Sequence, residues 1–148
     1  MSDIPIVIAS DHAGFELKEI LKSELEAIGM ATEDLGVHDT NAVDYPDMAN
    51  ALAAVVSENA NRRGLLLCGT GIGASIAANR HRRVRAALCH SAETARMARQ
   101  HNDANVLVLG SGGLGDALAQ EVLCTFLATP DGAARHGRRV DKILSMDR

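Results

Sequence analysis

The stretch Gly64-Leu65-Leu66-Leu67-Cys68-Gly69-Thr70-Gly71-Ile72-Gly73 predicts a strand and a glycine-rich turn ahead of a helix. Its first half is a short, continuously apolar run, which is typical of a strand buried on both faces of a parallel sheet. Polar residues directly after such a strand lie where open parallel sheets bind their ligands. The loop that begins at Cys68 is therefore the first candidate for a functional site.

Similar runs occur on both sides of this stretch. Strands are predicted at residues 4–9, 31–35, 86–89 and 106–109. Apolar residues recur at helical spacing between the first two, over residues 17–28, and Gly29 ends that helix. Strands that alternate with helices imply right-handed crossovers. We therefore predict an α/β fold, a Rossmann-like three-layer αβα sandwich with a five-stranded parallel sheet and a C-terminal helix.

Further helices are predicted from spacing and capping residues. One includes residues 48–56 after a loop at 36–46, a brief one spans 75–79, and another follows Ser91, whose hydroxyl suits an N-cap. The C-terminal helix, at about 133–146, places basic residues on one face and apolar residues on another. No linker or repeat divides the chain, so residues 1–148 form one predicted domain.

Composition narrows the class of partner. The chain has 148 residues, about the size of one domain, and a formal net charge of -4 at pH 7. This charge argues against nucleic acid or membrane partners, and we interpret the basic run at 80–85 as a solvated loop because no aromatic residues interleave it. No signal peptide or 18-residue apolar span is recognisable. We expect a cytoplasmic protein that acts on a small molecule.

The cysteines suggest chemistry at only one position. Cys68, Cys89 and Cys124 are an odd number at wide spacing, which fits neither a disulfide framework nor a Cys-x-x-Cys metal site. Cys89 and Cys124 are interpreted as small buried hydrophobes. Cys68 instead ends a strand before several free amides and a helix start, and both of these favour a thiolate. A thiolate at this position is a usable base.

The glycines after Cys68 are compatible with two kinds of ligand. Their backbone N–H groups can converge on a phosphate or on the oxyanion of an enediolate. The spacing of Gly69, Gly71 and Ala74 also satisfies a relaxed dinucleotide fingerprint, but the next strand ends in Cys89-His90 where a ribose-binding carboxylate is expected. A second glycine pattern, at residues 110–115, has no later strand to complete a nucleotide-binding unit. Nucleotide binding remains the weaker alternative.

Two further groups are candidates on spacing. His101 ends a helix before a strand, where an imidazole can transfer protons near neutral pH, although it can also serve only as a helix cap. Arg135 and Arg139 share one face of the last helix. Their guanidinium groups suit a phosphate, and equally an exposed face paired with acidic residues.

Taken in order, these blocks resemble the ribose-5-phosphate isomerase B family, which includes the galactose-6-phosphate isomerase subunits. The resemblance covers nearly the whole chain. It rests on Ser10-Asp11-His12-Ala13-Gly14-Phe15, Asp44-Tyr45-Pro46, Cys68 to Gly73 with Ile76-Ala77-Ala78-Asn79, Arg99-Gln100-His101-Asn102-Asp103, and Arg135-His136 with Arg139. Each block is weak alone, and five in order are specific.

The resemblance implies a mechanism and a role for each matching position. Cys68 would move a proton between C1 and C2 of a sugar phosphate through an enediolate. His101, with Asp11 nearby, would open the furanose ring and handle the hydroxyl protons. The remaining roles are Thr70 at the reacting end, the amides of Gly69, Gly71, Ile72, Gly73 and Ala74 at the enediolate, His12, Arg135 and Arg139 at the phosphate, and Tyr45 and Asn102 at sugar hydroxyls.

The resemblance also implies an assembly. Family members are homodimers or dimers of dimers with shared active sites, so the C-terminal helix is expected to reach a partner subunit. No metal or organic cofactor is implied. The expected reaction interconverts ribose 5-phosphate and ribulose 5-phosphate; the alternatives are a related four- or six-carbon sugar phosphate, or a non-catalytic phosphate- or nucleotide-binding module.

One position departs from the family pattern. Where the family usually has Gly-x-Arg after the fifth strand, this chain has Gly110-Ser111-Gly112. An arginine expected to face the substrate is therefore absent. We hypothesise that the amides of Gly112 and Gly113, or the side chain of Arg138, compensate for it.

Overall fold

A computed structural model describes residues 4–147. Its centre is a five-stranded sheet in the order β2-β1-β3-β5-β4, in which every pairing is parallel. The strands are β1 (Ile6–Ser10), β2 (Thr32–Asp34), β3 (Gly64–Cys68), β4 (Ala86–Leu88) and β5 (Val106–Gly110). The predicted fold class and all five predicted strands are confirmed.

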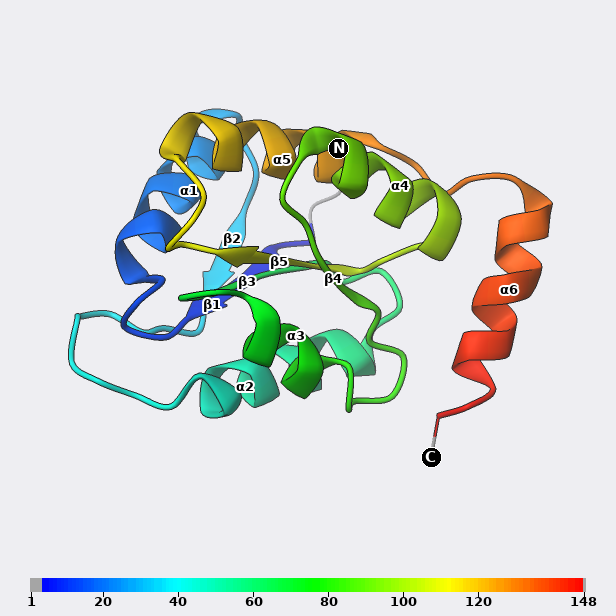
Figure 1. The fold of residues 1–148 in the computed structure, drawn as a ribbon, viewed down its shortest axis with the longest axis horizontal. Coiled ribbons are helices and arrows are strands. Elements are labelled where there is room, and N and C mark those ends of the chain that lie inside the picture. Colours follow the sequence, from blue (N-terminus) through cyan, green and yellow to red (C-terminus); the bar gives the residue numbers. More distant parts are fainter. Residues whose placement is uncertain (1–3, 148) are drawn as a thin grey trace.

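Helices cover both faces of the sheet (Figure 1). The helices of the chain are α1 (Phe15–Ala27), α2 (Tyr45–Glu58), α3 (Ile72–Ala78), α4 (Ala92–Asn102), α5 (Asp116–Ala128) and α6 (Ala134–Leu144). Helices α1, α4 and α5 lie on one face, and α2 and α3 lie on the other. Helix α3 begins earlier than predicted, because Gly71 adopts the left-handed conformation (φ 78°) and turns the chain directly into the helix. Ser91 caps α4 as predicted, accepting the Thr94 N–H at 3.1 Å.

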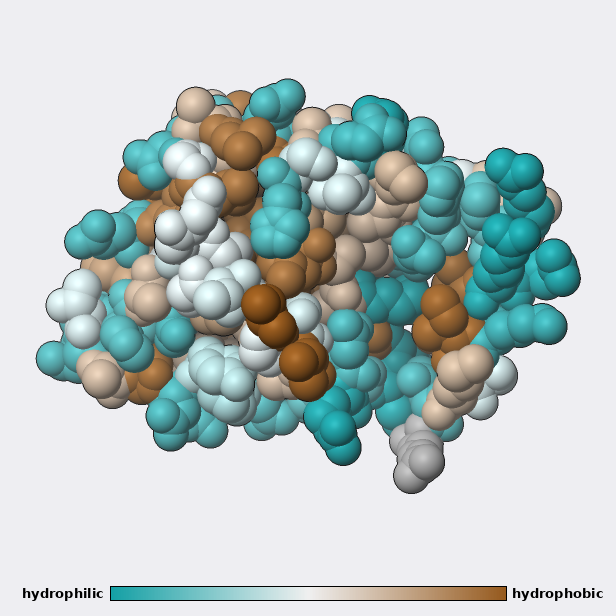
Figure 2. Space-filling view, in the orientation of Figure 1, coloured by the Kyte–Doolittle hydropathy of each residue, from teal (hydrophilic) through white to brown (hydrophobic). Residues whose placement is uncertain are grey.

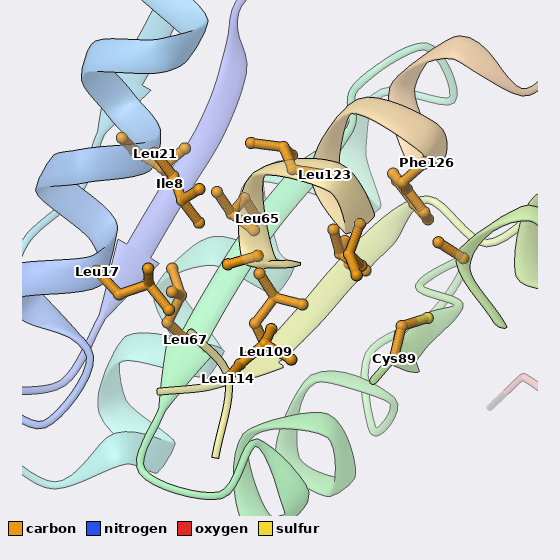
Figure 3. Close-up of a cluster of buried hydrophobic side chains, with 14 of the residues drawn as sticks. Ile8, Leu17, Leu21, Leu65, Leu67, Cys89, Leu109, Leu114, Leu123 and Phe126 are labelled. Atoms are coloured by element: carbon orange, nitrogen blue, oxygen red, sulfur yellow. The ribbon is translucent and has the colours of Figure 1, made fainter. Parts of the chain in front are cut away.

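Successive side chains of each strand point to opposite faces of the sheet and pack into two hydrophobic cores, one on each face. Ile8, Leu65 and Leu109 pack under α1 and α5, within the cluster drawn in Figure 3. Leu66 and Cys68 point to the opposite face, toward α2 and α3. A strand buried on both faces has no polar alternation, which is why β3 reads as a continuous apolar run.

The two remaining cysteines differ from each other. Cys89 is 1% exposed, as predicted, and burial raises the pKa of its thiol, although a hydrogen bond involving Thr94 opposes this effect. Cys124 is exposed, so its predicted burial is wrong. The reason is its position on α5: Val122, Leu123 and Phe126 form the buried stripe, and Cys124 lies outside it.

Helix α6 stands apart from the sandwich (Figure 1). It packs against α4, and Val140 is its one buried residue. A hollow separates its inner side from the body of the molecule (Figure 2). Its observed bounds agree with the predicted helix at about 133–146. Within residues 4–147, no helix combines the length and apolar character that a membrane span requires.

Candidate active site

Three loops meet at the edge of the sheet where the strands end. They follow β1, β3 and β5 and are joined by hydrogen bonds. The Ser111 N–H donates to the Cys68 carbonyl and the Gly112 N–H to the Gly69 carbonyl, each at 2.9 Å. The Ser111 hydroxyl donates to the Ala13 carbonyl at 2.8 Å. Hydrogen bonds from Ser111 and Gly112 therefore join the three loops at this edge.

Cys68 is the last residue of β3 and is only 4% exposed. Its Sγ accepts the Gly71 N–H at 3.1 Å. Gly71 makes this contact from a left-handed conformation in which a Cβ would lie 2.5 Å from Leu88 Cδ1, so only glycine fits. An N–H donated to sulfur stabilises the negative charge of a thiolate, as expected for a base at this position.

Further amides follow Gly71 at the start of α3. The Ile72 N–H donates to Thr70 Oγ1 at 3.2 Å. The first hydrogen bond within the helix is made by the Ser75 N–H, to the Gly71 carbonyl at 3.0 Å. The N–H groups of Gly73 and Ala74 precede that bond and have no acceptor in the helix. They are the donors that an enediolate oxygen beside Cys68 would need.

Tyr45 lies directly over this turn. It is the first residue of α2 and is 40% exposed. A Cβ on Gly73 would lie 2.3 Å from Tyr45 Cζ, so the absence of a side chain at Gly73 allows the ring to lie there. The structure thus brings together Tyr45 and the Cys68 loop, as the family resemblance implies.

Asp11 and His12 follow β1 at the same edge. Asp11 is 6% exposed, and its Oδ1 accepts the Gly14 N–H at 3.0 Å, which shapes the loop. His12 is exposed, and its Nδ1 accepts the Val43 N–H at 3.2 Å. Because Nδ1 accepts, Nε2 is the nitrogen that carries the proton of the neutral ring. His12 can therefore donate to a phosphate oxygen.

Gly112 does not compensate for the missing arginine in the way we hypothesised. Its N–H is already used by the Gly69 carbonyl at 2.9 Å. A Cβ at Gly112 would lie 3.0 Å from the same oxygen, so any side chain there would press on the Cys68 loop. The Gly113 amide and the Arg138 side chain remain the candidates to compensate for the missing arginine.

A buried ion pair supports this edge of the sheet and carries no predicted role. The Lys18 side chain is fully buried and its Nζ lies 2.6 Å from Asp34 Oδ2. The other oxygen of Asp34 accepts the Gly36 N–H, and the Gly36 carbonyl accepts the Ser10 N–H. Burial alone would raise the pKa of Asp34, but hydrogen bonds from Lys18 and Gly36 outweigh it and leave the pKa below its ordinary value.

The other predicted residues lie elsewhere in the chain. His101 and Asn102 end α4, which runs back from the end of β4 to the start of β5. They therefore lie at the edge of the sheet opposite Cys68. Arg135 and Arg139 lie on α6, which packs against α4. A single chain does not bring His101 close to Asp11, although the resemblance implies that these residues act together.

His101 instead contacts a residue with no predicted role. Its ring stacks on that of His136, with centroids 4.4 Å apart and planes 20° apart. Arg135 Nε donates to His136 Nε2 at 3.4 Å. A cavity of about 300 Å³ lies between α4 and α6 beside this pair. The one signal for His136 in the sequence is its place between two arginines of a matching block.

The described residues include no group of three or more His, Cys, Asp or Glu arranged to hold a metal ion.

Comparisons with known proteins identify the family of the chain. Residues 6–143 match the family described as Ribose/Galactose Isomerase. Ribose-5-phosphate isomerase B of Escherichia coli is 37% identical over 96% of this chain and 95% of that protein. The crystal structure of ribose 5-phosphate isomerase from Thermotoga maritima is 48% identical, covers 98% of this chain and 100% of its own, and superposes with a TM-score of 0.93.

A third similar protein was solved with a ligand. Ribose-5-phosphate isomerase B of Mycoplasma genitalium, with bound ribulose 5-phosphate, is 41% identical, covers 98% of this chain and 97% of its own, and has a TM-score of 0.93. Matches of this extent show that the chain belongs to the ribose/galactose isomerase family.

Proposed function

We propose that the chain interconverts ribose 5-phosphate and ribulose 5-phosphate by proton transfer through an enediolate. Cys68 as thiolate takes the proton from C2 of the open-chain aldose and delivers it to C1. The proton on the O2 hydroxyl moves to O1, so that the aldehyde becomes a primary alcohol and C2 becomes a carbonyl. No atom is gained or lost, and no redox cofactor is required.

The observation that carries this proposal is the contact between Cys68 Sγ and the Gly71 N–H at 3.1 Å, inside an interlocked turn. The same turn offers the Gly73 and Ala74 amides to the enediolate, with Thr70 beside them. A base and oxyanion donors on one rigid turn suit proton abstraction next to a carbonyl. The Mycoplasma genitalium relative, which is 41% identical and was solved with bound ribulose 5-phosphate, supports a pentulose phosphate as the ligand.

We further propose that each site combines two chains in a homodimer. Cys68, Tyr45 and His12 lie at one edge of the sheet, and His101, Asn102, Arg135 and Arg139 lie at the other edge or on α6. A second copy can present its α4 end and α6 to the first copy's Cys68 loop. Exposed Ile72 and Ile76, on α3 next to that loop, supply an apolar surface for such contact (Figure 2).

The free thiols support a cytoplasmic location. All three cysteines are unpaired, which fits a reducing environment, and the proposed base must stay reduced to act. We therefore place this activity in the cytoplasm.

A panel of tetrose, pentose and hexose phosphates, assayed for aldose–ketose conversion, tests the proposal. We expect turnover of ribose 5-phosphate in preference to the others. Turnover of a four- or six-carbon sugar phosphate instead would support the alternative substrate, since Gly112 leaves the far end of the site without the usual arginine. Binding of sugar phosphates without conversion of any of them would favour the binding-module alternative.

A further inference from the structure

We propose that His136 is a positioning residue, which holds the His101 imidazole and the Arg135 guanidinium in one fixed arrangement at the ring-opening end of the site. The inference rests on the proposed function, since it adds a residue to that site. Its physical basis is two contacts of the His136 ring, one with His101 and one with Arg135.

The first contact is the stack with His101. The ring centroids are 4.4 Å apart and the planes are nearly parallel, which is the geometry of favourable aromatic packing. His101 lies in the last turn of α4, where a side chain on a helix end has considerable rotational freedom. Stacking on His136 restricts that freedom, because tilting the plane of the His101 ring away would break the contact between the rings. An imidazole that must reach a ring oxygen gains from such preorganisation.

The second contact is the hydrogen bond from Arg135. Arg135 Nε donates to His136 Nε2 at 3.4 Å, so this nitrogen carries no proton. Burial, and then the nearby His101, Arg135 and Arg139 cations, lower the pKa of His136 below its ordinary value. A neutral His136 can face the cationic Arg135 without repulsion. It therefore joins the proton-transfer group to the phosphate-binding group.

The end of α4 is anchored close to this contact. Arg99, two residues before His101 in the helix, is 4% exposed. Its Nη1 donates to the Ala104 carbonyl at 2.7 Å and to Asp103 Oδ1 at 2.8 Å, which fixes the end of α4. Its Nε donates to the Thr129 carbonyl at 3.1 Å, in the segment that leads to α6. The stack thus joins α6 to an end of α4 that a buried arginine already fixes.

The acidic groups around His101 and His136 do not perform the positioning role proposed for His136. Asp103, Asp131 and Asp141 line the cavity between α4 and α6. Asp103 is engaged by Arg99 and Arg85. These carboxylates balance the positive charge of the region, whereas the ring of His136 determines the direction of His101.

The test compares two reactions of one enzyme. Ribose 5-phosphate is mostly a closed furanose and must be opened, whereas ribulose 5-phosphate stays open because its O5 is bonded to phosphate. Enzyme-catalysed exchange of the C1 proton of ribulose 5-phosphate with D₂O therefore needs the base Cys68 but no ring opening. We expect His136→Ala to lower kcat for ribose 5-phosphate by about 10-fold and to change the exchange rate by less than about 2-fold.

His136→Phe separates the two contacts. A phenyl ring preserves the stack but cannot accept from Arg135, so we expect kcat near the parental value and a raised KM for ribose 5-phosphate. Lys142→Ala, an exposed cation elsewhere on α6, is the control and should change neither. An equal loss of turnover and exchange in His136→Ala, or no loss of either, would overturn the inference. So would a kcat in His136→Phe as low as in His136→Ala.

A second measurement does not depend on activity. Ring-current shifts of the His101 ring protons in the NMR spectrum should be present in the parent and in His136→Phe and absent in His136→Ala. Their absence from the parent would overturn the inference even if the isomerase activity is found. If they are present but no sugar phosphate is converted, the proposed function fails while the stacking contact stands.

Discussion

The Cys68 loop and the α4–α6 end of the molecule are organised in opposite ways. Backbone hydrogen bonds from Ser111 and Gly112 join the loop to its neighbour. Glycines occupy the positions where a Cβ would collide with surrounding atoms. The α4–α6 end has one buried α6 residue, a ring stack and a cavity. The Cys68 loop and the residues around it come from a single chain. Within that chain, the side chains at the end of α4 lie at the opposite edge of the sheet from this loop. Rigid backbone thus builds the proposed proton-transfer half, and long side chains on a helix build the proposed ring-opening and phosphate half.

The largest expected effect concerns the first region alone. Cys68→Ser removes the proposed base but keeps a similar volume, so kcat should fall at least about 10²-fold. Steady-state turnover of ribose 5-phosphate measures this. Cys124→Ser, at an exposed cysteine, is the matched control and should retain parental activity. Parental turnover by Cys68→Ser would contradict the mechanism.

Mixing two inactive variants tests whether the halves come from different chains. Cys68→Ser and His101→Ala should each be nearly inactive alone. After the subunits are exchanged at equal concentrations, we expect about one quarter of the parental activity, because half of randomly paired dimers are mixed and each mixed dimer has one complete site. Activity that stays at the sum of the two variants would show that Cys68 and His101 act within one chain.

A smaller effect is expected from Gly73→Ala, which disturbs the junction between the loop and α2. Its Cβ would lie 2.3 Å from the Tyr45 ring, so the ring must move away from the turn. We expect KM for the sugar phosphate to rise about 10-fold, since small displacements of positioning groups are costly. Gly113→Ala, where a Cβ has open space, is the control. Equal KM values for the two variants would count against a role for Tyr45 in the site.

The smallest expected effect is a pH dependence of stability in the first region. The pKa of Asp34 is lower in the folded chain than its ordinary value of 3.8. Its carboxylate therefore adds stability that is fully present above pH 3.8 and is lost as the pH falls through the folded pKa. Urea unfolding at a series of pH values should show a steeper acid loss in the parent than in Asp34→Asn. Identical slopes below pH 4 would argue that the Lys18 pair contributes nothing to stability.

Most of the sheet and the Cys68 loop were predictable because local patterns decide them. Runs such as residues 64–68 are apolar since both faces of the strand are covered, and the left-handed turn at Gly71 requires glycine. The capping Ser91 was predictable for a similar reason, since its hydroxyl bonds within the first turn of its own helix. These contacts join residues a few positions apart.

Contacts between distant residues were not predictable. Cys124 looks as apolar as Cys89, and only the packing of α5 shows which face is outward. Nothing in the spacing pairs Lys18 with Asp34, because the partner is chosen by two elements that meet in the fold. His136 is one residue among several basic ones until its ring is seen against His101.

The sequence by itself determined the alternation of strands and helices, the place of Cys68 at a strand end and the glycines that bring amides to it, because each depends on neighbours along the chain. Only the tertiary structure decided that His101 lies at the edge of the sheet opposite Cys68, since α4 runs back across the sheet before it ends. It also decided that the Gly112 amide is already occupied and that His136 faces His101, because those partners come from separate segments.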